Sequence, residues 1–307
     1  MPKLSVIVPI YFNAASLPLL FDKLQTVERQ LNKRGLELEL IFVDDGSGDD
    51  SFAVLQSIKA RRPATRLVKL SRNFGAIRAC KAGALFVTGD CFGFLAADLQ
   101  DPPELLLEMV ERWQKGAKYV LCVRAERDDP IVSRLWAAFY YRLLRLFVLP
   151  AFPDGGYDLA LMDKIILPYL QQSGRTAHLQ VFLFWLGFRP EFIAYKRQKR
   201  EHGRSRWSFA KRLTASLDVL LGFSVVPIRV ISLIGAIVSL GSFGYGTVQL
   251  ASALLGIRPV PGFASLAALI SFLLGLVIIM LGIIGEYVWR IFEEVNRRPE
   301  SVIDEVL

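Results

Sequence analysis

Short apolar runs alternate with longer segments of helical periodicity in the N-terminal part of the chain. Runs with the length and composition of strands occupy residues 3–10, 39–44, 67–70 and 92–97. Segments with apolar residues at helical spacing occupy residues 15–33, 50–61, 75–88 and 103–115. Because strands that alternate with helices pair in parallel, the pattern predicts an α/β domain with a mostly parallel sheet.

Two far longer apolar runs lie near the C-terminus. No charged residue occurs at 230–257 or at 259–285. Each run exceeds the about 20 residues that a helix needs to cross a bilayer core, so we expect transmembrane helices at about 229–254 and 264–289. The chain is thereby divided into a globular domain, a two-helix membrane hairpin and a tail, at 1–222, 223–290 and 291–307.

The formal net charge of the chain is +8. Basic residues gather just before the first apolar run, at Lys196, Arg197, Lys199, Arg200, Arg204, Arg206, Lys211 and Arg212. Positive residues favour the cytoplasmic side of a membrane. We therefore expect a multi-pass protein of the inner or plasma membrane, with both termini and the globular domain in the cytoplasm. A basic surface beside a membrane also suits lipid headgroups or phosphates, although topology alone accounts for part of this charge.

Aromatic and apolar residues recur at helical spacing among arginines in the segment 133–149. Such a helix can lie on a membrane surface, and a similar segment at 207–222 directly precedes the first apolar run. We favour this interpretation over packing on the sheet or against a partner. Glycines within the two apolar runs permit close helix packing and hence a homo-oligomer.

Several common functional classes lack their motifs in this sequence. The three cysteines form no CxxC pair, and the two histidines are isolated, so neither a disulfide framework nor a zinc site is indicated. No GxGxxG follows the first strand, and no GxxxxGK[ST] or GxSxG occurs. These absences argue against dehydrogenases, P-loop nucleotidases and α/β-hydrolases.

Acidic residues stand where the predicted strands end, at Asp44, Asp45 and Asp98. Ligands of parallel sheets bind at the carboxyl ends of strands, which also draws attention to Tyr11. Asp44, Asp45 and Ser47 could bind the N–H groups of a base and the hydroxyls of a ribose. An ordinary turn with a helix cap is the alternative, because Asp, Gly and Ser are common in turns.

The segment 98–104 reads Asp-Leu-Gln-Asp-Pro-Pro-Glu. Asp98 and Gln100 alternate along an extended chain, so their oxygens can face one side and hold Mg²⁺ or Mn²⁺ on a diphosphate. We expect Asp101 and the two prolines to begin a helix.

The basic run 197–207 contains Gly203 and Ser205 among its arginines. Arginines bind phosphate through a rigid fork of donors, and the small residues allow a turn close to an anion. We interpret this run as a phosphate site; contact with lipid headgroups alone is the alternative.

As an ordered set, these motifs resemble the glycosyltransferase family 2 enzymes with a GT-A fold. More narrowly, the chain looks like the polyprenyl-phosphate group of that family, which includes dolichol-phosphate mannose synthases and bacterial bactoprenol glucosyl- and aminoarabinosyltransferases. The resemblance runs nearly end to end. It is carried by residues 6–11, 43–47, 71–75, 98–104, 123–127, 161–163, 200–206, 285–287 and 298–299.

The resemblance implies a role for each matching residue. The nucleotide base and ribose would be contacted by Pro9, Tyr11, Asp44 and Asp45. Asp98 and Gln100 would hold the metal, and Asp98 would be catalytic together with Asp158, which would sit near the sugar. The lipid phosphate or the donor diphosphate would be held by Arg124, Arg134, Arg200, Ser205 and Arg206.

The implied reaction is an inverting, in-line transfer of a sugar to undecaprenyl or another polyprenyl phosphate. UDP-glucose is the first expectation for the donor, with other UDP-sugars and GDP-mannose as alternatives. A phosphate is already ionised near neutral pH, so catalysis would rest on positioning and charge neutralisation rather than on a strong base. No nucleic acid partner is expected.

The chain departs from the family pattern at three places. Ala14 and Ala15 stand where a pair of glutamates is usual, Ala96 replaces the first Asp of an Asp-x-Asp-x-Gln motif, and Ala160 replaces an Arg. The main rival function is therefore a non-catalytic family member that binds nucleotide or lipid and supports a membrane partner. A processive polysaccharide synthase is disfavoured because neither a QxxRW motif nor further spans occur.

Overall fold

The structure is a computed structural model of the chain. It describes residues 1–125, 131–174, 178–198, 219, 222–224, 226–255, 262–296 and 298–307. The chain forms two compact units, Met1–Ser216 with Arg298–Leu307, and Leu217–Arg297.

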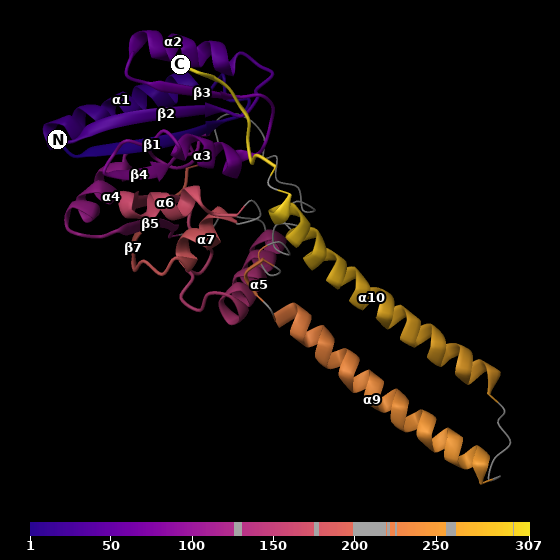
Figure 1. Cartoon of the computed structure of the whole chain (residues 1–307). Coiled ribbons are helices and arrows are strands. Elements are labelled where there is room, and N and C mark those ends of the chain that lie inside the picture. The colour runs from indigo at the N-terminus through magenta and orange to yellow at the C-terminus, as the bar shows by residue number, and fades with distance from the viewer. Residues whose placement is uncertain are drawn as a thin grey trace. The chain divides into compact units, whose positions relative to one another are not determined.

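An eight-stranded sheet forms the centre of the first unit, in the order β7-β5-β6-β4-β1-β2-β3-β8 (Figure 1). The strands are β1 (Lys3–Ile10), β2 (Glu37–Asp44), β3 (Arg66–Leu70), β4 (Cys91–Phe94), β5 (Tyr119–Arg124), β6 (Leu159–Asp163), β7 (Pro190–Tyr195) and β8 (Ile303–Val306). β6 pairs antiparallel with β4 and β5, and β8 pairs antiparallel with β3; the other pairs are parallel. The predicted α/β fold with a mostly parallel sheet is confirmed.

Helices cover both faces of this sheet. α1 (Leu17–Lys33), α2 (Ser51–Arg61) and α4 (Leu105–Gln114) share one core cluster with the strands, and α3 (Ala76–Ala84) packs on β1 and β2. The first unit also contains α5 (Ile131–Phe147), the 3₁₀ turn η1 (Lys164–Ile166), α6 (Leu167–Gln171) and α7 (Leu179–Trp185). Val6 and Val8 of β1 join the core cluster that includes Leu24 of α1. Ile7 points the other way, toward α3, where a Cβ on Gly83 would lie 2.5 Å from its Cγ2 atom. Burial of both faces explains why these strands are continuously apolar.

The C-terminal segment differs from the tail that we expected at 291–307. The last membrane-type helix continues to Val295, and Ile303–Val306 forms β8 on the open edge of β3. Lys81 on α3 anchors this segment, because its Nζ lies 2.6 Å from the Glu300 carboxylate and donates to the Ser173 carbonyl oxygen at 2.8 Å. The end of the chain is thus part of the first unit's sheet.

The second unit contains two long helices, α9 (Val226–Leu254) and α10 (Phe263–Val295). Their stretches Ile228–Ser252 and Phe272–Val295 have mean hydropathies of 1.6 and 2.2 and are exposed, so length and composition suit a transmembrane hairpin. The helices approach closely where a Cβ on Gly235 would lie 2.9 Å from the Met280 Cε atom.

The helix that we expected at 133–149 is α5. Leu144 is fully buried on its inner side, whereas Phe139 and Leu146 are exposed. The second helix expected at 207–222 falls almost wholly outside the described residues.

Candidate functional site

The loops that carry the predicted site residues meet at one edge of the sheet. β1, β2, β4, β5 and β7 run parallel and therefore end at the same edge. β6 runs the opposite way and begins there, with Leu159 opposite Cys122 near the end of β5. Residues just after the parallel strands and just before β6 are thereby brought together.

Asp44 ends β2 as a buried carboxylate. Its Oδ1 accepts a hydrogen bond from the Ser47 N–H at 3.3 Å, and its Oδ2 has no hydrogen-bond partner within the described part of the chain. Burial raises the pKa of this carboxyl group above its usual value. A buried carboxylate oxygen without a partner is costly, so Asp44 is suited to receive a donor from a ligand.

The neighbouring Asp45 has a different role. Its carboxylate accepts hydrogen bonds from the backbone N–H of Phe74 at 2.7 Å and of Gly75 at 2.9 Å, and from the Asn73 Nδ2 at 3.1 Å. Burial raises the pKa of Asp45, and the two backbone hydrogen bonds oppose that shift. Asp45 therefore holds the loop after β3 in place, which its sequence motif did not reveal.

Two strained residues lie in the loops of this edge. Within the described residues, Phe12 (φ 57°) and Leu99 (φ 60°) are the only residues other than glycine with positive φ. Phe12 follows Tyr11, and its N–H donates to the Ser47 hydroxyl at 3.2 Å. Pro9 pairs with Val43 across β1 and β2. Strained backbone of this kind is concentrated at functional sites.

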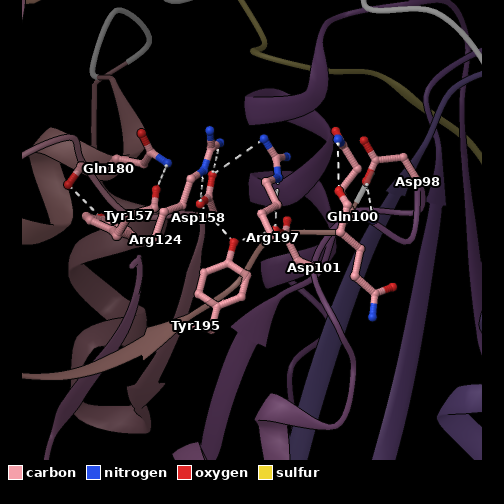
Figure 2. A network of polar contacts seen from close by, with 10 residues as sticks. Asp98, Gln100, Asp101, Arg124, Tyr157, Asp158, Gln180, Tyr195 and Arg197 are labelled. Carbon is pink, nitrogen blue, oxygen red and sulfur yellow. Dashed lines mark hydrogen bonds and ion pairs between the residues drawn. The ribbon is translucent and has the colours of Figure 1, made fainter. Parts of the chain in front are cut away.

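The loop after β4 carries the predicted metal residues. The Asp98 Oδ1 accepts from the Gln100 N–H at 3.2 Å, and the Gln100 carbonyl oxygen accepts from the Gln198 N–H at 2.9 Å. Asp101 does not begin the helix as we expected, because α4 starts only at Leu105. Its carboxylate is buried and points instead into a cluster of charged groups (Figure 2).

We call this group the acid–arginine cluster; its members are Asp101, Arg124, Asp158, Tyr195 and Arg197. Arg124 donates to Asp158 through two atoms, Nε to Oδ2 at 2.7 Å and Nη2 to Oδ1 at 2.6 Å. The Tyr195 hydroxyl lies 2.5 Å from the Asp101 Oδ1 and 2.8 Å from the Asp158 Oδ2. The Arg197 Nε donates to the same Asp101 oxygen at 3.2 Å. Figure 2 shows these side chains pointing toward one another.

The surroundings of the two acids shift their pKa values in opposite directions. Burial would raise the pKa of Asp158, but the hydrogen bonds and charge of Arg124 outweigh burial and lower it. Burial dominates at Asp101 and raises its pKa, against the opposing charge of Arg197. Burial also raises the pKa of Tyr195, so its phenol keeps its proton. Asp158 is therefore an ionised partner of Arg124 and a poor base at neutral pH.

A second layer of hydrogen bonds supports the segment before β6. The Tyr157 hydroxyl donates to the Gln180 carbonyl oxygen at 2.7 Å, and the Gln180 Nε2 donates to the Tyr157 carbonyl oxygen at 2.6 Å. The hydroxyls of Tyr157 and Tyr119 lie 2.7 Å apart. These contacts fix the backbone immediately before Asp158 to α7.

The structure assembles part of the predicted set of residues. Asp98, Gln100, Arg124 and Asp158 lie in neighbouring loops of the same edge (Figure 2). Arg134 lies on α5, but its side chain is outside the described structure, and Arg200, Ser205 and Arg206 fall in the residues that are not described. Tyr195, the contact of Arg197 with Asp101 and the orientation of Asp101 were missed, although Tyr195 ends a strand directly before the basic run.

The donors at Asp98 and Gln100 suit a hard divalent cation. Within the described residues, no group of three or more His, Cys, Asp or Glu side chains could hold a metal ion by itself. Mg²⁺ and similar ions are often held by one or two carboxylates together with substrate phosphates. One carboxylate and one amide oxygen therefore fit an ion that a bound diphosphate helps to hold, and Ala96 supplies no second carboxylate.

The sequence matches the model of glycosyl transferase family 2 over residues 5–168. A glycosyltransferase of Synechocystis is 33% identical over 99% of this chain and 95% of its own length. The bactoprenol glucosyl transferase of Shigella phage SfII is 31% identical over 98% of this chain and 97% of its own length.

A solved structure has the same fold. The glucosyl-3-phosphoglycerate synthase of Mycobacterium tuberculosis aligns with a TM-score of 0.50 over 72% of this chain and 78% of its own, at 16% sequence identity. This similarity concerns the fold and supports its identification as GT-A.

Proposed function

This chain belongs to glycosyl transferase family 2, and we propose that it transfers a sugar, with UDP-glucose as the favoured donor, to undecaprenyl or another polyprenyl phosphate. One observation carries the proposal: the similarity to the bactoprenol glucosyl transferase of phage SfII extends over 98% of this chain. It therefore includes the apolar C-terminal helices as well as the sheet domain. An acceptor that is itself a membrane lipid explains why both parts occur in one chain.

The donor would bind over the ends of β1, β2 and β4. The unpartnered Asp44 oxygen suits an N–H of the base, and Pro9, Tyr11 and Ser47 lie in the same loops. Asp98 and Gln100 would hold Mg²⁺ or Mn²⁺, which when bound neutralises charge on a diphosphate leaving group. The synthase of the same fold was also solved with Mn²⁺ and UDP-glucose.

The transfer itself needs little proton chemistry. An oxygen of the acceptor phosphate would form a bond to the anomeric carbon, while the bond from that carbon to the donor diphosphate breaks and UDP leaves with the electron pair. The anomeric configuration inverts because one displacement occurs. The phosphate is already ionised, so Asp158 near the sugar would act by holding the Arg124 guanidinium rather than by taking a proton.

The acceptor phosphate and the donor diphosphate would be held by arginines. Arg124 is the member of this set whose side chain the structure describes, with Arg134, Arg200, Ser205 and Arg206 as the remaining proposed ligands. Guanidinium groups bind phosphate through paired N–H donors, which orients the reacting oxygen as well as neutralising its charge.

The membrane topology is also a proposal. We place the sheet domain and both termini in the cytoplasm, because basic residues flank the two helices while Arg258 is the charged residue between them. The three native cysteines are buried, so a maleimide should label them little and should react mainly with a cysteine introduced at the surface. In intact cells, a membrane-impermeant maleimide should label Arg258→Cys and not Lys33→Cys; the reverse pattern would invert the topology.

The direct test of the donor uses the full chain in nanodiscs with undecaprenyl phosphate. Radiolabelled UDP-glucose, UDP-galactose, UDP-N-acetylglucosamine and GDP-mannose are each incubated with Mg²⁺ or Mn²⁺, and label is counted in the lipid fraction. We expect lipid-linked label from UDP-glucose. Label in the lipid from a different donor would correct the sugar, and no lipid label from any donor would favour a non-catalytic family member.

A further inference from the structure

Tyr195 brings a buried hydroxyl to the edge where the proposed ligands lie. It is the last residue of β7 and pairs in register with Arg124, the last residue of β5. Its carbonyl oxygen accepts a hydrogen bond from the Ala125 N–H at 2.9 Å. The residue is 6% exposed, so its ring is fixed in the core while its hydroxyl reaches the acid–arginine cluster.

The hydroxyl lies between carboxylates from two separate loops. Asp101 belongs to the loop after β4, which also carries Asp98 and Gln100, and Asp158 precedes β6. The Tyr195 oxygen is within 2.5 Å of one carboxylate and 2.8 Å of the other. Two carboxylates this close repel each other, and the single proton of the phenol can join them when their two oxygens share it in a three-centred hydrogen bond.

The arginines of the cluster do not replace this bridge. Arg124 donates to Asp158 through its Nε and Nη2 atoms. Arg197 contacts both acids, but at 3.2 Å from Asp101 and 4.0 Å from Asp158 its contacts are longer than those of Tyr195. Tyr195 and Arg197 each contact both acids, and the shorter contacts are those of the phenol oxygen (Figure 2).

We infer that Tyr195 is a positioning residue for the transfer, because its hydroxyl holds Asp158, and through it the Arg124 guanidinium, at a fixed place relative to the loop 98–101. The inference rests on the proposed function, in which that loop holds the donor diphosphate and Arg124 holds a phosphate. In-line displacement requires these two groups of ligands to keep their spacing. A misplacement of roughly 1 Å can lower a rate by about 100-fold.

The test compares two substitutions that each remove one buried hydroxyl. Tyr195→Phe removes the bridge, whereas Ser173→Ala removes a buried hydroxyl that donates to the Leu170 carbonyl oxygen at 2.7 Å and takes no part in the site. The full chain in nanodiscs is assayed for kcat with UDP-glucose and undecaprenyl phosphate, and for UDP affinity with Mn²⁺ by calorimetry. We expect Tyr195→Phe to lower kcat by about 10-fold or more and UDP affinity by about threefold, with neither change in Ser173→Ala.

A double substitution identifies the route of the effect. If Tyr195 acts through the bridge, adding Tyr195→Phe to Asp101→Ala should lower kcat by much less than Tyr195→Phe does alone, because the bridge is already broken. If Tyr195→Phe matches Ser173→Ala in kcat and in UDP affinity, the Tyr195 hydroxyl has a purely structural role and the inference is wrong. If the wild-type chain glycosylates no lipid phosphate, the proposed function fails, and the UDP affinities of the two variants still decide whether Tyr195 positions the loop.

Discussion

The guanidinium of Arg124 is bound through two nitrogen atoms to the carboxylate of Asp158, at 2.6 and 2.7 Å. Arg124 is the last residue of β5, and Asp158 directly precedes β6, which pairs antiparallel with β5. Their side chains are 22% and 15% exposed. An arginine proposed to bind phosphate is thus already oriented by a protein carboxylate. This is a common way to fix a flexible cation before its ligand arrives, and it makes Asp158 a partner of Arg124 rather than an independent base.

The first prediction concerns the pH dependence of this pair. Because the folded-state pKa of Asp158 is lowered, its contribution to stability is complete above the unfolded value near 3.8 and is lost as the pH falls through the lower, folded value. Asp158→Asn should therefore cost about 1.5–3 kcal/mol at pH 7 and progressively less in acid. Thermal unfolding of both proteins from pH 3 to pH 7 measures this. A difference in Tm that grows as the pH falls would contradict the ion pair.

The second prediction concerns Asp45. Asp45→Ala leaves the backbone N–H groups of Phe74 and Gly75 without their acceptor, so it should destabilise the fold by about 1–3 kcal/mol. Asp45→Asn keeps one oxygen as an acceptor and should cost less. Chemical or thermal unfolding measures how far Asp45 holds the loop after β3. UDP titration of the folded protein measures whether Asp45 also binds the nucleotide. Unchanged stability in Asp45→Ala with lost UDP binding would make Asp45 a direct ligand, as its motif first indicated.

The third prediction concerns the attachment of the C-terminal segment. The Lys81–Glu300 ion pair has side chains that are 11% and 24% exposed, so Glu300→Ala leaves a poorly solvated ammonium group. We expect a loss of about 1–3 kcal/mol. Glu111→Ala is the matched control, because it removes an exposed ion pair with Lys115 that water and salt screen, so its contribution to stability should be small. Equal Tm values for the two variants would show that Glu300 does not hold the segment.

Local patterns were sufficient for the first four strands, their helices and the two long apolar helices. Each of these elements is defined by the spacing or length of apolar residues within one stretch of chain. β8 could not be predicted in this way, because Ile303–Val306 is largely exposed and is a strand only through its pairing with β3. Its register is set by residues far away in the sequence, because Val306 pairs with Val68 and Glu305 with Lys69.

In the site, too, local features could be predicted from the sequence, and contacts between distant residues could not. Asp44, Asp98 and Gln100 could be proposed as site residues because acids and amides at strand ends are visible in the sequence. The orientation of Asp101 was not predicted, because its partner Tyr195 lies 94 residues further along the chain. Asp44 and Asp45 have the same side chain in the same turn. Within the described residues the Asp44 Oδ2 has no hydrogen-bond partner, whereas the Asp45 carboxylate accepts hydrogen bonds from the loop after β3. Residue type and spacing cannot distinguish these two cases.

The central claim is that the loop after β4 holds a metal ion and the donor diphosphate during transfer to a lipid phosphate. The most direct measurement is the formation of undecaprenyl-phosphate-linked glucose by the full chain in nanodiscs with UDP-glucose and Mn²⁺, compared with Asp98→Asn and with Asp22→Asn, which alters an exposed acid on α1. We predict product from the wild type and from Asp22→Asn, and at least about a 100-fold loss in Asp98→Asn with an unchanged Tm. Equal product from Asp98→Asn, or product that is insensitive to removal of the metal, would contradict this account.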